Sequence, residues 1–231
     1  MKILLTLCLS LFLLQAQNLP NTEQLIVVTT QNWSTSNGLL QRYERTDKQW
    51  HKAGKAIEIK LGRNGLGWGV GLHTTPKNAK IIKKEGDGKA PAGIFNLKQA
   101  FGYAPFSAKY PYKVYKETDH CVDDVKSKLY NKIVDSRKVS IDYKSKEHMK
   151  FPKDYYKYGI VVNHNHIDEE GAKKGAGSCI FIHIKKIPTA GCTVMSESEM
   201  KEIIRWLNPE SKPLLLQGTE EVIKTLWKKI K

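Results

Sequence analysis

Apolar and alternating runs along the first part of the chain predict a β-sheet. Gln24 to Thr30 is largely apolar, Leu39 to Glu44 alternates, and the two runs flank the turn-rich segment N-W-S-T-S-N-G. Short runs separated in this way are typical of a β-hairpin. Trp50 to Leu61 has the length and pattern of a third strand. The chain therefore opens as a β-sheet.

Two later runs predict buried strands. Tyr158 to Asn163 reads Y-G-I-V-V-N and Cys179 to Ile184 reads C-I-F-I-H-I, both short and rich in β-branched or aromatic residues. In a strand, alternation divides the side chains of the second run between two faces. One face carries Ile180, Ile182 and Ile184, which we expect in a core, and the other carries Cys179, Phe181 and His183.

Two amphipathic stretches near the end of the chain predict helices. The segment from Ser196 to Glu199 forms a capping box before apolar residues at helical spacing, and Asn208-Pro209 ends that stretch. Residues 220–231 form a C-terminal helix with apolar residues on one side and lysines opposite. We expect this helix to dock on the core, with adhesion to an anionic membrane surface as the alternative. Pro213 to Gln217 is a short strand candidate between the two helices.

Together these elements predict a mainly β fold with flanking helices (α+β), arranged as a mixed-sheet sandwich or barrel. A chain of 231 residues with 40% hydrophobic residues is long enough for one domain with a substantial core. Residues 1–16 combine a charged start, a leucine-rich run and a small residue, which is typical of a secretory signal peptide. No later apolar run approaches membrane-spanning length. We therefore expect an exported protein of the periplasm or cell envelope, with residues 17–231 as a single domain.

The formal net charge of +15 is the strongest bias in the composition. Such a charge suits nucleic acid or an anionic polymer. The lysines are scattered and are not gathered with interleaved aromatic residues, so we expect no nucleic-acid binding and consider acidic envelope polymers as partners. The lysine-rich residues 136–157 resemble a surface excursion or lid. The polar segment from Asp119 to Asp135 is interpreted as a structural loop, with a direct role in catalysis as the alternative.

A histidine and a cysteine nine positions apart form the candidate reactive pair. His183 lies in a predicted strand, and Cys192 follows Gly191 after a tight connection that contains Pro188. A thiol with an ordinary pKa is only slightly ionised at neutral pH, so a neighbouring imidazole must take its proton before the sulfur attacks a carbonyl. The N–H groups of Gly191 and Cys192 could converge on the oxyanion of a tetrahedral intermediate. The implied chemistry is acyl transfer.

The cysteine count agrees with this interpretation. Beyond Cys8 in the predicted signal peptide there are three cysteines, and an odd number in an exported protein indicates a free thiol. Cys192 is the natural free one. Cys121 and Cys179 are a disulfide candidate because an oxidising compartment permits the bond. Two buried, unpaired thiols are an equally good interpretation.

The residues around the pair resemble the signature of an enzyme family. S-C-I-F-I-H, a short basic loop and P-T-A-G-C-T-V-M are similar to the catalytic signature of the YkuD-type L,D-transpeptidases, cysteine enzymes that cross-link or trim bacterial peptidoglycan. E-G-D-G-K-A-P-A-G-I-F, from Glu85 to Phe95, is similar to the family segment G-D-x-x-T-P-x-G-x-F. Two positions depart from the common pattern. Ala190 stands where His or Lys usually precedes Gly-Cys, and Ile184 stands where Gly usually follows the histidine.

The resemblance implies a catalytic domain of the L,D-transpeptidase type that reacts through a thioacyl-enzyme. It implies that Cys192 is the nucleophile, that His183 is the general base and acid, and that the backbone carbonyl of Ile184 orients His183. Gly191 would supply a backbone contact to the oxyanion. The residues expected to bind substrate are His164, Asn165 and Thr189. The implied partners are peptidoglycan stem peptides, and we expect a monomer with no cofactor and no metal.

Three alternatives stay open from the sequence. The same site could hydrolyse its acyl-enzyme, as an L,D-carboxypeptidase or other hydrolase that trims stem peptides. A secreted zinc protein could use His164 and His166, which would share a strand face, together with His183; chelators would then abolish function and Cys192→Ser would be tolerated. A basic module that binds a polymer would leave Cys192 unreactive and would bind with a strong dependence on salt.

Overall fold

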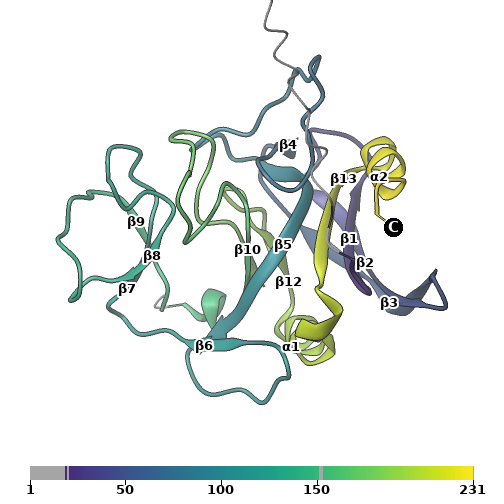
Figure 1. The fold of residues 1–231 in the computed structure, drawn as a ribbon. Coiled ribbons are helices and arrows are strands. Elements are labelled where there is room, and N and C mark those ends of the chain that lie inside the picture. The colour runs from purple at the N-terminus through teal and green to yellow at the C-terminus, as the bar shows by residue number, and fades with distance from the viewer. Residues whose placement is uncertain (1–18, 20, 151–152, 231) are drawn as a thin grey trace, which may run out of the picture.

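The fold is mostly β and is built around a closed eight-stranded mixed barrel (Figure 1). The computed structural model describes residues 19, 21–150 and 153–230, so the predicted signal peptide, residues 1–16, lies outside the described residues. The barrel strands are β1 (Gln24–Thr30), β2 (Asn37–Thr46), β3 (Gln49–Lys60), β5 (Ala90–Gly102), β10 (Tyr158–Val162), β11 (Phe181–Ile184), β12 (Thr193–Met195) and β13 (Leu214–Thr219). The predicted mainly β class with flanking helices is confirmed.

The barrel closes because β5 pairs with β13 on one side and with β10 on the other. Around the barrel the order is β10, β11, β12, β3, β2, β1, β13 and β5. The β1–β13 and β11–β12 pairs are parallel and the remaining pairs around the barrel are antiparallel. Two short strands, β4 (Leu66–Trp68) and β6 (Tyr112–Val114), add to β5. The predicted hairpin of the first two strands and the predicted third strand are confirmed.

The barrel interior is the main hydrophobic core. All eight barrel strands contribute buried residues to it, for example Ile26, Leu40, Phe95 and Ile182. Helix α1 (Glu197–Trp206) adds Met200, Ile203, Ile204 and Leu207. The helix begins at the predicted capping box: the Ser196 hydroxyl accepts from the backbone N–H of Glu199, and the Glu199 carboxylate accepts from that of Ser196. Burial of one apolar face stabilises a helix this short, which would be marginal alone.

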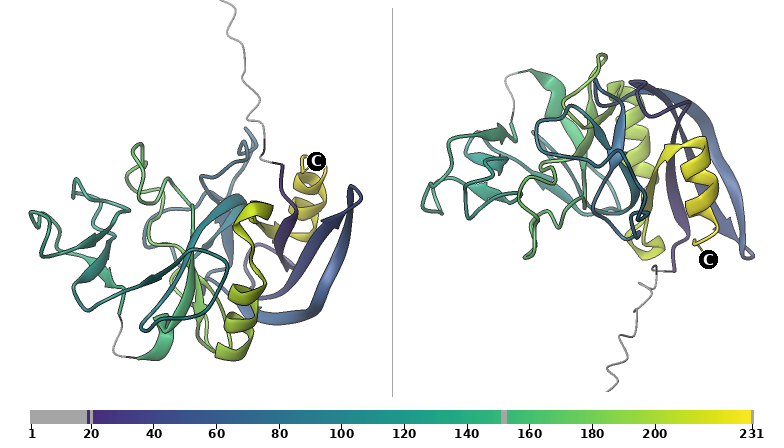
Figure 2. Two further views of the ribbon diagram at one scale, coloured as in Figure 1. Left: turned by 60° about the horizontal axis from the view of Figure 1, so that its bottom comes forward. Right: turned by 90° about the horizontal axis from the view of Figure 1, so that it is seen from above.

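Two outer layers cover opposite sides of the barrel (Figure 2). Helix α2 (Glu220–Trp227) packs on the outer face of β1 and β13 through Val222 and Leu226. On the other side, a second cluster of buried residues joins β5, β10 and β11 to the long segment between β5 and β10. We call this segment, residues 103–157, the excursion. The excursion carries β7 (Asp119–Val122), β8 (Ile133–Asp135) and β9 (Lys146–His148), a three-stranded sheet in the order β8-β7-β9. The 3-10 helix η1 (Asp154–Tyr156) then leads into β10, and a second one, η2 (Pro209–Ser211), precedes β13.

Several predicted boundaries differ from the structure for identifiable reasons. The strand expected from Cys179 begins at Phe181, because Cys179 has a φ of 54°, in the left-handed region, and cannot continue a strand. The C-terminal helix expected over 220–231 ends at Trp227, although Ile230 still packs on the core. No helix in the described part of the chain is long and apolar enough to cross a membrane.

Candidate active site

His183 and Cys192 lie on one face of two adjacent parallel strands. In the β11–β12 pair, Ile182 stands opposite Thr193 and His183 opposite Val194, so Cys192, directly before β12, stands beside Phe181. Since side chains alternate, Phe181, His183 and Cys192 share the outer face, which carries the second hydrophobic cluster. The backbone N–H of Phe181 donates to Cys192 Sγ at 3.3 Å. The structure therefore brings the predicted base and nucleophile to diagonal positions on the outer face of the barrel.

The imidazole of His183 is held by backbone carbonyls and by an aromatic ring. Its Nδ1 lies 3.1 Å from the carbonyl oxygen of Ile184 and 3.1 Å from that of Tyr155. Both carbonyls can only accept, which assigns the hydrogen to Nδ1 and leaves the lone pair on Nε2. The Tyr156 ring packs edge-to-face on the imidazole with centroids 4.8 Å apart. His183 is 4% exposed, and this burial lowers its pKa to about 4, so it is a neutral base at neutral pH.

The thiol of Cys192 is neutral in the resting structure. The residue is 8% exposed, and burial raises the pKa of the thiol to about 12. The N–H of Phe181 opposes this shift, the charge of Glu147 adds to it, and the ammonium groups of Lys83 and Lys185 oppose it. A neutral thiol and a neutral imidazole at diagonal positions of one face would need proton transfer during attack, so the arrangement suits general-base catalysis and not a preformed ion pair.

The turn before Cys192 is closed by Thr189. The Thr189 hydroxyl donates to the carbonyl oxygen of Cys192 at 2.6 Å and accepts from the backbone N–H of Gly191 at 3.0 Å. The N–H of Gly191, predicted as an oxyanion donor, is therefore occupied by this side chain. Thr189, predicted to bind substrate, is buried and holds the turn. A Cβ at Gly191 would lie 3.0 Å from the carbonyl oxygen of Lys89, so close packing explains the glycine.

His164 and Asn165, also predicted to bind substrate, are buried and hydrogen-bonded to backbone groups. His164 Nδ1 accepts from the N–H of Val70 at 3.3 Å, and its Nε2 lies 3.0 Å from the carbonyl oxygen of Ala176. The Asn165 side-chain amide donates to the carbonyls of Lys173 and Gly177 at 2.9 Å. Both side chains therefore hold the 173–177 loop, and their contact with a substrate stays a prediction.

A disulfide and a buried asparagine connect the excursion to Cys179, two residues before β11. Cys121 of β7 is bonded to Cys179, and 58 positions separate them. The side chain of Asn131 donates to the carbonyls of His164 and Asn165 and accepts from the N–H of Cys179 at 2.9 Å. The sequence marks the segment that contains Asn131 as polar but does not show its hydrogen bond to Cys179. No pattern around Tyr156 indicates that its ring packs on His183.

The three histidines of the zinc alternative do not come together. His164 is buried, whereas His166 is exposed and its Nδ1 lies 3.6 Å from the carboxylate of Glu169. Neither residue lies in β10, and Asn165 between them has a φ of 53°, so the two do not share a strand face. Among the described residues, no three His, Cys, Asp or Glu side chains are grouped so that they could hold a metal ion.

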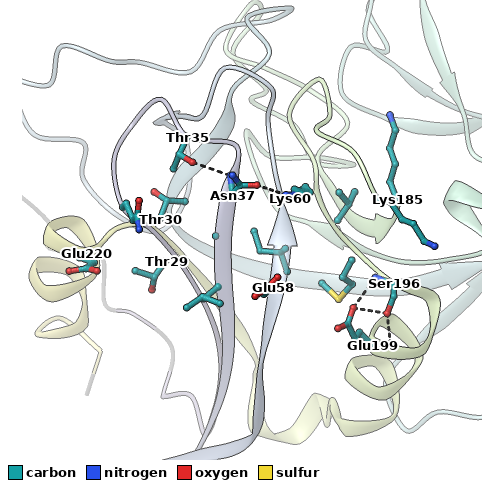
Figure 3. A pocket seen from close by; sticks show the side chains of 17 residues that line it. Thr29, Thr30, Thr35, Asn37, Glu58, Lys60, Lys185, Ser196, Glu199 and Glu220 are labelled. Atoms are coloured by element: carbon teal, nitrogen blue, oxygen red, sulfur yellow. Dashed lines mark hydrogen bonds between the residues drawn. The ribbon is translucent and has the colours of Figure 1, made fainter.

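A surface groove of about 670 Å³ is lined by residues of β1, β2, β3 and β12 and by the residues that follow β11 and β12 (Figure 3). It forms where β12 meets β3 through one residue pair, Val194 with Lys60. Lys185, two residues after His183, lines the groove, and its ammonium lies 5.1 Å from the ring centroid of Tyr155. Neither Cys192 nor His183 lines the groove. Cys192 and His183 are therefore buried outside this groove, and Cys192 packs in the cluster that joins the barrel to the excursion.

Comparison with known proteins gives two distant likenesses. No protein-family model matches the chain, and no curated protein matches it. The solved structure of Bd1075 from Bdellovibrio bacteriovorus is similar with a TM-score of 0.41 and 15% identity, over 90% of this chain and 54% of that one. The helical cell shape determining protein Pgp2 from Campylobacter jejuni is similar with a TM-score of 0.41 and 13% identity, over 87% of this chain and 49% of that one. The chain thus spans about half the length of each.

Proposed function

We propose that this protein is an exported cysteine acyltransferase of the YkuD type that acts on peptidoglycan stem peptides. Residues 17–231 form its catalytic domain, which works as a monomer without metal or cofactor. Cys192 is the nucleophile and His183 the general base and acid. The product is an L,D cross-link between two stem peptides.

One observation carries this proposal. The parallel pairing of β11 and β12 places Cys192 and His183 on one wall, and the carbonyls of Ile184 and Tyr155 hold the hydrogen of the imidazole on Nδ1. Nε2 is then the basic atom, as proton removal from a thiol requires. Main-chain carbonyls serve as the orienting third member, so no side-chain acid is needed. Burial of both groups excludes water and strengthens the electrostatic interactions between them.

The reaction divides into acylation and deacylation. In acylation, Cys192 Sγ attacks the carbonyl carbon of an amide that follows an L-centre, and the thiol proton passes to His183 Nε2. The tetrahedral intermediate collapses, the C–N bond breaks, and His183 returns the proton to the leaving amine. In deacylation, an amine of a second stem peptide attacks the thioester carbonyl and gives a proton to His183. The C–S bond then breaks, and His183 returns that proton to Cys192 Sγ. A new amide bond completes cross-linking.

The alternative outcome uses the same acyl-enzyme. If water attacks the thioester, the product is a shortened stem peptide with a free carboxylate, and the protein is an L,D-carboxypeptidase. Cys192 is 8% exposed, so the access of water and of an acceptor amine to the thioester sets the outcome. The distribution of products decides between the two outcomes.

The test is incubation of the purified protein with muropeptides of defined stem length, followed by mass spectrometry of the products. We expect cross-linked dimers and release of the terminal residue, with neither product from Cys192→Ala. Shortened monomers alone would assign trimming. Binding without any product, weakened by salt, would instead assign a basic polymer-binding protein.

A further inference from the structure

A lysine and an aspartate form a buried ion pair beside the nucleophile turn. Lys83 is 4% exposed, and its ammonium lies 2.7 Å from Asp87 Oδ1 and donates to the carbonyl of Lys84 at 2.6 Å. Lysine is almost never fully buried unless it is paired, because removing an ammonium from water is costly. Neither the predicted site nor the proposed reaction uses this pair, although Asp87 belongs to the segment that resembles the family motif.

The loop that carries the pair packs directly on Gly191. Asp87 accepts from the backbone N–H groups of Lys84 and Lys89 at 2.7 and 2.9 Å, so the loop is wrapped around its carboxylate. A Cβ at Gly191 would lie 3.0 Å from the Lys89 carbonyl oxygen and 3.8 Å from Lys83 Cε. The last methylene before the ammonium therefore reaches the backbone of the residue that precedes Cys192.

Charged and polar groups face the Cys192 thiol from several elements. His183 comes from β11, Tyr156 from η1, Glu147 from β9 and Lys185 from the end of β11. Lys83 is the cation among them that is removed from solvent, whereas Lys185 is partly exposed and its effect is screened. The ammonium of Lys83 opposes the rise in the Cys192 pKa that burial causes.

We propose that the Lys83–Asp87 ion pair sets the charge environment of the nucleophile. The ammonium of Lys83, held next to Gly191, stabilises negative charge as it develops on the Cys192 sulfur. Asp87 fixes the ammonium in place and offsets part of its charge. This inference rests on the proposed function only in taking Cys192 as the nucleophile.

Substitution of Lys83 and substitution of Asp87 should change the reactivity of Cys192 in opposite directions. A purely structural role of the pair would not have this effect. We would measure the alkylation rate of Cys192 by iodoacetamide in the intact protein between pH 7 and 9, with mass spectrometry of the Cys192 peptide. In this range the rate follows the thiolate fraction. Lys83→Met should slow alkylation on the order of tenfold at each pH, because a single charge in a partly buried site changes the free energy of the thiolate by about this much. Asp87→Asn should accelerate it.

Lys84→Met is the matched control, because Lys84 is the adjacent lysine and its side chain is exposed; its rate should equal that of the unmodified protein. Equal rates in all three variants, or slowing in both Lys83→Met and Asp87→Asn, would overturn the inference. The thermal unfolding midpoint of each variant is compared with that of the unmodified protein to check that the fold is kept. Alkylation needs no peptidoglycan substrate, so these rates stand apart from failure of the proposed transfer reaction, which would appear as missing muropeptide products.

Discussion

The backbone carbonyl of Cys179 lies 3.6 Å from the Sγ atom of Cys192. Cys179 is bonded through its own sulfur to Cys121, on the excursion that covers the site. The free thiol is therefore in contact with the main chain of a residue that a covalent bond fixes to the covering layer. This contact connects the excursion to the position of the Cys192 thiol.

Removal of the disulfide should destabilise the protein and disturb the thiol. The chain-entropy model predicts a loss of about 4 kcal/mol in the free energy of unfolding for a loop of this length. We expect Cys121→Ser combined with Cys179→Ser to lower the midpoint of guanidinium unfolding and to increase the alkylation rate of Cys192, which becomes more exposed. An unchanged midpoint would contradict the prediction.

Loss of the imidazole should slow acylation strongly while leaving the thiol in place. Removal of a general base typically costs 10²- to 10⁴-fold in rate. We therefore expect His183→Gln to slow acylation by a carbapenem by at least about 100-fold, measured as the mass increase of the intact protein with time. His166→Gln is the control, because His166 is an exposed histidine of the site region. Equal rates in the two variants would remove His183 from the mechanism.

Gly191 is required for close packing of the turn before Cys192. A Cβ there would lie 3.0 Å from the Lys89 carbonyl oxygen and 3.2 Å from Ile180 Cδ1, both closer than ordinary contacts. We expect Gly191→Ala to displace Cys192 and to reduce carbapenem acylation about tenfold or more, a small misplacement being enough to have this effect. Ala190→Ser changes the exposed neighbour and should acylate normally. Normal acylation by Gly191→Ala would show that the turn adjusts freely.

Buried neutral imidazoles should make the protein less stable in mild acid. Burial lowers the pKa of His73 from 6.5 to about 4, so below pH 6.5 the unfolded chain binds a proton that the folded chain does not. The free energy of unfolding then falls from pH 6.5 to about 4, by about 2 kcal/mol per such imidazole at pH 5. We expect His73→Gln to lose less stability between pH 7.5 and 5 than the unmodified protein in denaturant unfolding. His166→Gln should lose as much stability over this pH range as the unmodified protein. An equal loss in His73→Gln would contradict the assignment of this acid sensitivity to His73.

The sequence predicts most elements because their patterns are local. The first hairpin, the capping box at Ser196 and the two faces of β11 depend on neighbouring residues, and the structure has all three. Other features depend on contacts distant in sequence. The strand begins two residues late because Cys179 is held by Cys121 and Asn131.

The contacts of the residues expected around the reactive pair also depend on segments distant in sequence. The sequence identifies His164, Asn165 and Thr189 as polar and near the motif, but it does not show that their hydrogen bonds go to backbone groups. Tyr156 and Lys83 reach the site from separate segments. Their roles follow from tertiary packing, to which no spacing in the sequence corresponds.

The most direct test of the account is to trap the acyl-enzyme. The purified protein would be mixed with a disaccharide tetrapeptide, quenched in acid within seconds, digested, and examined by mass spectrometry. The account predicts a thioester-linked stem peptide on the peptide that contains Cys192, and no adduct in Cys192→Ala. Turnover of the substrate with no adduct on Cys192, or with equal turnover by Cys192→Ala, would contradict it.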